Sequence, residues 1–63
     1  MKPKNLKQAL EQDYFVCKIY NKGGKRIRVT LQERHISDRE MFVEFWIDSK
    51  YFERNYKDIY DRF

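Results

Sequence analysis

Two segments of the chain, residues 14–21 and 25–33, alternate between polar and apolar side chains, and Gly23 and Gly24 lie between them. Successive side chains of a β-strand point to opposite faces, so this alternation predicts two strands that each have two chemically different faces. Adjacent glycines between such runs are a turn signal. The segment therefore predicts an antiparallel β-hairpin, and the chain must fold around an antiparallel sheet.

The loop length sets the register of this hairpin. A three-residue loop at residues 22–24 places apolar side chains opposite one another and requires a left-handed Gly24 at its end. The predicted apolar pairs are Ile19 with Ile27, Cys17 with Val29, and Phe15 with Leu31. On the other face, the predicted pairs are Tyr20 with Arg26 and Lys18 with Arg28.

The two faces of the predicted hairpin differ in chemistry. The apolar face holds Phe15, Cys17, Ile19, Ile27, Val29 and Leu31. The other face is aromatic and basic, and holds Tyr14, Val16, Lys18, Tyr20, Arg26, Arg28, Thr30 and Gln32. Like charges opposite each other on a sheet cost stability, so folding alone does not account for this second face. It predicts a binding surface.

A short helix is predicted before the hairpin. Pro3 suits the first position of a helix, and Leu6, Ala9 and Leu10 then share one face of it. We expect the helix to end near Gln12 and to depend on packing, because a helix this short is marginal in isolation.

A third strand and a second helix are predicted after the hairpin. The strand covers residues 41–47, with Met41, Val43, Phe45 and Ile47 facing inward and Phe42, Glu44 and Trp46 facing outward. Paired with the second strand, it sets Val43 opposite Leu31, Phe45 opposite Val29, and Trp46 beside Arg28. Asp48 or Ser49 caps the final helix, whose apolar stripe is Phe52, Tyr56, Ile59, Tyr60 and Phe63.

The order of these elements predicts one α+β domain over residues 1–63: a short N-terminal helix, a three-stranded antiparallel meander, and a C-terminal amphipathic helix packed on one sheet face. Its basic residues are unevenly distributed. Residues 1–36 hold nine Lys or Arg and three acidic residues, a net charge of +6, whereas residues 37–63 have a net charge of −2. This asymmetry predicts an anionic partner for one side of the molecule.

Several classes of function are disfavoured by the sequence. A chain of 63 residues buries too small a core to frame a deep catalytic cleft, so we do not expect an enzyme. Cys17 is predicted to be a small inward-facing hydrophobe, with His35 far from it in a loop. We expect no metal site and no cofactor. A single cysteine and the lack of an apolar run of about 20 residues favour a cytoplasmic protein without membrane contact.

These observations predict a non-enzymatic nucleic-acid-binding module. Cations neutralise phosphates, and flat aromatic rings stack on bases. The candidate binding residues are Tyr14, Lys18, Tyr20, Lys22, Lys25, Arg26, Arg28 and Trp46. Three alternatives give this face a purely structural role. The N-terminal helix covers it, Glu44 neutralises Arg28, or surface cation–π pairs form between Tyr20 and Arg26 and between Trp46 and Arg28.

The strand–strand–strand–helix order loosely resembles the sheet-type DNA-binding domains of phage integrases and plant ethylene-response factors. It also loosely resembles small phage proteins that inhibit bacterial nucleases, anti-CRISPR proteins among them. Both resemblances concern topology and size, with no residue motif. The second implies an inhibitor that docks on a nucleic-acid-handling enzyme, with Trp46, Tyr20 and Arg28 as hot spots. We expect a monomer or a small homo-oligomer.

Overall fold

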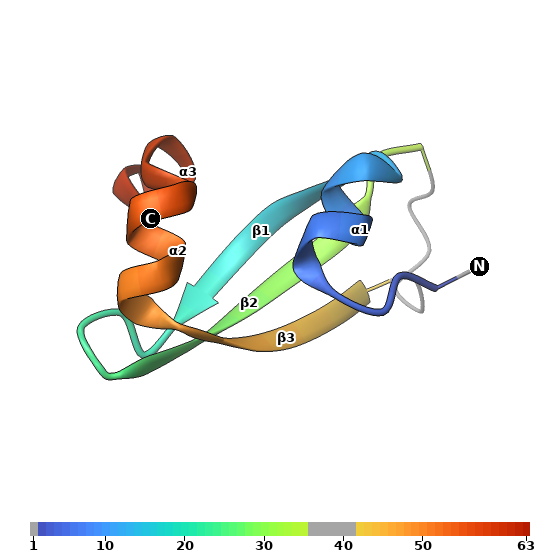
Figure 1. Ribbon diagram of the computed structural model, residues 1–63. Helices are drawn as coiled ribbons and strands as arrows, with labels where there is room; N and C mark the ends of the chain where they lie inside the picture. Colours follow the sequence, from blue (N-terminus) through green and yellow to red (C-terminus); the bar gives the residue numbers. More distant parts are fainter. Residues whose placement is uncertain (1, 36–41) are drawn as a thin grey trace.

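The computed structural model describes residues 2–35 and 42–63 and confirms the predicted α+β order. The elements are α1 (Leu6–Glu11), β1 (Tyr14–Tyr20), β2 (Arg26–Glu33), β3 (Phe42–Asp48), α2 (Ser49–Asn55) and α3 (Lys57–Arg62). The strands form one antiparallel sheet in the order β1-β2-β3 (Figure 1). Met41, the predicted first residue of the third strand, lies outside the described residues.

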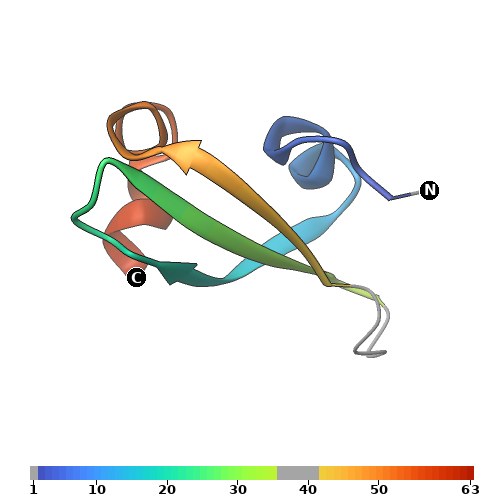
Figure 2. The same cartoon turned by 90° about the horizontal axis from the view of Figure 1, so that it is seen from below.

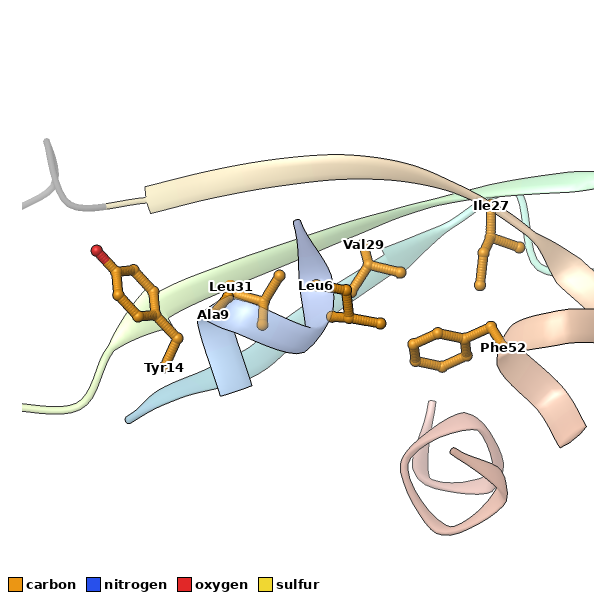
Figure 3. Close-up of a cluster of buried hydrophobic side chains, with 7 residues drawn as sticks. All are labelled: Leu6, Ala9, Tyr14, Ile27, Val29, Leu31 and Phe52. Atoms are coloured by element: carbon orange, nitrogen blue, oxygen red, sulfur yellow. The ribbon is translucent and has the colours of Figure 1, made fainter. Parts of the chain in front are cut away.

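The hydrophobic core lies on one face of the central strand. It consists of Leu6, Ala9, Tyr14, Ile27, Val29, Leu31 and Phe52 (Figure 3). Helix α1 lies over one end of the sheet, and α2 and α3 lie at the other end, beside the hairpin (Figures 1 and 2). Within the described residues, all three helices therefore share one sheet face, and the opposite face has no helix packed on it.

Helix α1 begins one turn later than predicted. The side chain of Asn5 accepts a hydrogen bond of 2.8 Å from the backbone N–H of Gln8, which makes Asn5 the N-cap in place of a start at Pro3. The helix ends at Glu11, with Gln12 as its C-cap, which agrees with the predicted end near Gln12. Leu6 and Ala9 are buried on the predicted apolar face.

The predicted C-terminal helix is divided in two. Asp48 caps α2 by accepting a hydrogen bond of 2.9 Å from the backbone N–H of Tyr51, as predicted. Tyr56 then adopts φ −134° and ψ 47°, which is not helical, and α3 begins after it. Phe52 remains fully buried, whereas Phe63, predicted to lie on the same buried stripe, is 44% exposed.

The register between β2 and β3 is the predicted one. Val43 lies opposite Leu31, Phe45 opposite Val29, and Trp46 opposite Arg28. The apolar pattern excludes a shift of this pair by one residue, because such a shift would expose the buried face of β2.

The predicted register between β1 and β2 is wrong by two residues. The loop covers residues 21–25 instead of 22–24, and Ile19 lies opposite Val29 instead of Ile27. Tyr20 is therefore opposite Arg28, and Lys18 is opposite Thr30. The predicted repulsion between Lys18 and Arg28 as direct partners does not exist. A shift by two residues preserves the face of each side chain, so Lys18 and Tyr20 still lie where the sequence predicted.

A β-bulge at Cys17 reverses the faces of the first half of β1. Val16 pairs with Leu31 and Lys18 pairs with Thr30, so Cys17 is an extra residue without a partner of its own. Its thiol donates a hydrogen bond of 3.4 Å to the carbonyl oxygen of Thr30, and burial raises the pKa of the thiol above its ordinary value. Residues 14–16, which precede the bulge, therefore each lie on the sheet face opposite to the predicted one.

Tyr14 is the candidate binding residue affected by this exchange. It is 4% exposed and belongs to the core, so its predicted place on the open face is wrong. Val16, also predicted on the open face, packs against the core instead. Phe15, predicted to be inward, lies on the opposite face, with the Arg34 guanidinium 5.4 Å from its ring centroid.

The hairpin loop provides a test of the observed backbone. Gly23, and not Gly24 as predicted, has a positive φ of 106°, and no atom lies within 4 Å of where its Cβ would be. We expect Gly23→Ala to lower the free energy of unfolding by about 1–2 kcal/mol, through backbone strain alone. D-Alanine at the same position in the synthetic chain should restore stability, because it favours positive φ. Urea unfolding measures both, and an L-alanine variant as stable as wild type would contradict this loop conformation.

Candidate functional site

The sheet face opposite the helices, called here the outer face, carries three rows of side chains that cross the strands. The rows are Tyr20–Arg28–Trp46, Lys18–Thr30–Glu44 and Phe15–Gln32–Phe42. Aromatic side chains therefore occupy both edge strands, with polar side chains of β2 between them. Tyr20 and Phe42 are each 37% exposed and Trp46 is 55% exposed, which is unusual for aromatic rings of this size.

Arg28 lies between two aromatic rings. Its guanidinium carbon is 4.2 Å from the Tyr20 ring centroid and 6.0 Å from that of Trp46. Both distances are within the range of cation–π attraction. The predicted pair of Trp46 with Arg28 is therefore confirmed, whereas Tyr20 contacts Arg28 and not Arg26 as predicted, because the register between β1 and β2 differs by two residues. The arrangement holds a planar cation and two rings in fixed positions at one end of the outer face.

Glu44 partly neutralises Arg28, as one of the alternatives anticipated. A carboxylate oxygen of Glu44 accepts a hydrogen bond of 3.0 Å from the Thr30 hydroxyl and lies 3.4 Å from Arg28 Nε. Among the described residues, that buried Nε has no hydrogen-bond partner, so charge attraction holds this pair. The Arg28 side chain remains 36% exposed, and its guanidinium has further N–H donors.

The positive charge of the outer face is on β1 and β2. Lys18 and Arg26 are exposed there, and Lys18 Nζ lies 5.2 Å from the Tyr20 ring centroid. Strand β3 instead contributes Glu44 and Asp48, the latter opposite Arg26. A negatively charged ligand is therefore attracted to the β1–β2 half of the face, with the Trp46 ring at the far edge.

The two lysines of the hairpin loop have different surroundings. Lys22 Nζ donates a hydrogen bond of 2.6 Å to the carbonyl oxygen of Tyr60 and lies 4.3 Å from the centroid of that ring. This lysine therefore ties the loop to α3. The Lys25 side chain is exposed, while its carbonyl oxygen accepts a hydrogen bond of 2.9 Å from the Ser49 N–H. Of the two, Lys25 is the one available to a ligand.

The candidate residues thus fall into three groups. The structure brings together Lys18, Tyr20, Arg26, Arg28 and Trp46 on the outer face. Lys25 lies at the end of the hairpin and Lys22 contacts α3, whereas Tyr14 is in the core. Phe42 lies on the outer face, as predicted, and Phe15 lies there although it was predicted to face inward. Phe15 could not be identified from alternation because the bulge at Cys17 interrupts it.

A groove of about 550 Å³ adjoins the outer face along β3, and we call it the edge groove. Its lining includes Lys4 and Lys7 near α1, Phe45 and Trp46 of β3, and Tyr51 of α2. None of Lys4, Lys7 and Tyr51 was a candidate. Tyr51 does give a signal in the sequence, because it is a large aromatic residue that lies off the apolar stripe of its helix; in the structure it is 55% exposed.

Of the helices described here, none has the length and apolar character needed to cross a membrane. Comparison of the chain with models of protein families, with curated proteins and with solved structures gives no significant match.

Proposed function

We propose that this protein is a non-enzymatic nucleic-acid-binding module and that its outer face is the binding surface. The observation that carries the proposal is the Tyr20–Arg28–Trp46 row, in which two exposed rings flank a guanidinium beside the free cations of β1 and β2. This combination is typical of proteins that bind nucleic acids without sequence preference, because cations neutralise phosphates and flat rings stack on unpaired bases.

The distribution of charge determines how the ligand lies. Phosphates lie over Lys18 and Arg26, with Lys25 extending this basic area towards the loop. Glu44 repels phosphates from the β3 side, where the Trp46 ring provides a stacking surface for a base instead. Contacts of this kind recognise backbone charge and base planes, so we expect little preference for sequence.

A second candidate function is an inhibitor-type protein that docks on a nucleic-acid-handling enzyme through the same face. The Arg28–Glu44 pair favours it, because this pair reduces the free positive charge of the outer face. Tyr, Trp and Arg are also the residue types that dominate protein–protein interfaces. The two functions differ in their dependence on salt.

Fluorescence anisotropy with labelled single- and double-stranded DNA and RNA, across a salt series, tests the proposal. We expect affinity to fall steeply as salt rises, and Arg26→Gln to reduce the slope of log K against log salt by roughly 0.7–0.9. Trp46→Ala should weaken single-strand binding by about 1–3 kcal/mol. Phe63→Ala, which removes an exposed ring from the C-terminus, is the matched control and should leave binding unchanged.

Two results would overturn the proposal. The first is no detectable binding of the wild-type protein to any of these nucleic acids near 50 mM salt, low enough to favour phosphate contacts. The second is binding that Trp46→Ala and Arg26→Gln leave unchanged. The first result favours the inhibitor function, for which Trp46→Ala would act mainly on the dissociation rate from a protein partner. The second result excludes the outer face as the binding surface.

A further inference from the structure

We infer that the edge groove binds a single-stranded nucleic-acid segment that continues from the outer face around strand β3. This inference rests on the proposed function and adds three binding residues to it: Lys4, Lys7 and Tyr51. The ligand class is single-stranded DNA or RNA, recognised by phosphate charge and by the planes of unpaired bases.

The outer face and the edge groove form one continuous surface. Trp46 and Glu44 belong to the outer face, and both also line the edge groove. Phe45 and Ile47 of the same strand line it from the opposite side of the sheet. Strand β3 is an edge strand, and none of the strands described here pairs with its outer edge, so the groove passes around this edge and connects both sides of the sheet. A chain that stacks on Trp46 can enter the groove without leaving the protein surface.

The chemistry of the groove matches the same ligand. Lys4 and Lys7 are exposed, and the Tyr51 ring is 55% exposed, as is that of Trp46. Glu44 is the acidic residue among the described residues that line the groove, and Arg28 lies 3.4 Å from its carboxylate. The groove therefore combines two cations whose charge is not cancelled locally with two accessible rings.

These features favour single strands over duplexes. In a duplex the faces of the bases are already covered by neighbouring base pairs, so Trp46 and Tyr51 would have no surface on which to stack. An acidic peptide would pair its carboxylates with Lys4 and Lys7. It would provide no flat group to stack on the Trp46 and Tyr51 rings. The combination of rings and cations is thus better matched by unpaired bases joined by phosphates.

Anisotropy with labelled oligothymidylate and oligouridylate of about 16 nucleotides, a length at the upper end of single-strand site sizes, tests the inference and compares DNA with RNA. The double variant Lys4→Gln/Lys7→Gln should reduce the slope of log K against log salt by about 1.4, which corresponds to two lost phosphate contacts. The matched control is Lys50→Gln/Arg54→Gln, which removes the same charge from exposed positions on α2. It should change the slope much less.

Tyr51 provides a second readout that is independent of charge. Tyr51→Ala should weaken binding of the same oligonucleotides roughly 5- to 150-fold, whereas Tyr51→Phe, which retains the ring, should bind like wild type. Thermal unfolding of each variant checks that the fold is intact; the exposed position of Tyr51 makes a large loss of stability unexpected.

The outcomes separate this inference from the proposed function. If Arg26→Gln reduces the salt slope and Trp46→Ala weakens binding while the variants of Lys4, Lys7 and Tyr51 bind like wild type, the groove inference is overturned and the outer face stands. If the variants of Lys4, Lys7 and Tyr51 weaken binding while Arg26→Gln leaves it unchanged, the outer face is the wrong surface. If a labelled polyglutamate peptide binds in place of the oligonucleotides and loses affinity with Lys4→Gln/Lys7→Gln, the groove is a site for acidic peptides and the inference fails.

Discussion

Phe52→Ala should leave the protein largely unfolded at 25 °C. Phe52 is fully buried at the junction of α2 with the sheet, and its ring centroid lies 5.4 Å from that of Tyr56 and 6.3 Å from that of Tyr60. Removing a buried phenylalanine ring costs about 3–5 kcal/mol. The core of a domain this small rarely supplies more than roughly that amount of net stability, so the loss of one ring removes most of it.

Circular dichroism during thermal unfolding checks this expectation, and Phe63→Ala is the matched control. The same chemical change at Phe63 affects a ring that is 44% exposed and should lower the melting temperature only slightly. A Phe52→Ala variant that melts cooperatively near the wild-type temperature would show that α2 is not packed on the sheet as described.

Tyr14→Ala should also cost about 3–5 kcal/mol of unfolding free energy, the value typical for a buried aromatic ring. Tyr14 is 4% exposed because the bulge at Cys17 turns it towards the core. Phe15→Ala, on the adjacent residue, should cost only about 1 kcal/mol because its ring is half-buried on the outer face. Urea unfolding of both variants ranks the two residues.

This ranking distinguishes the bulged strand from a regular one. If β1 alternated without interruption, Phe15 would be in the core and Tyr14 on the open face, so Phe15→Ala would be the more destabilising change. That reversed order would contradict the bulge and would return Tyr14 to the candidate binding surface.

The β2–β3 pair shows which parts of the fold can be predicted from the sequence. Its alternation is uninterrupted, and a single register matches Val29 with Phe45 and Leu31 with Val43. The cap of α2 was equally readable, because Asp48 precedes a helical pattern and short polar side chains favour that position. In both cases the structure adopts a solution that the local pattern allows: the predicted register for the strands, and Asp48 in place of Ser49 for the cap.

The β1–β2 register shows the opposite case. Pairing Ile19 with Ile27 or with Val29 satisfies the apolar pattern equally well, because the two registers differ by two residues and side-chain orientation repeats every two residues. The longer loop is favoured by Asn21, which adopts a left-handed φ of 63° and whose side-chain amide donates a hydrogen bond of 3.0 Å to the Arg26 carbonyl. A pattern of polar and apolar residues does not show which of the two loops is the more stable.

The candidate site was predictable to the same extent as the strands that carry it. Lys18, Tyr20, Arg28 and Trp46 lie on one face because the two-residue error preserved their orientation. The contact of Lys22 with Tyr60 was not predictable, because it joins residues that are 38 positions apart and depends on the break at Tyr56. The edge groove was not predictable either, because its lining comes from segments far apart in the sequence, at α1, β3 and α2.

The extra residue in β1 is one that the strand could lose. Cys17 has no partner in β2, whereas Val16 before it and Lys18 after it are both paired and face opposite sides of the sheet. Deletion of Cys17 would make Val16 and Lys18 adjacent, the spacing at which a regular strand places side chains on opposite faces, so Tyr14 would stay in the core. Natural variants of this chain should therefore include chains that are one residue shorter at this point, as well as chains with other side chains at position 17.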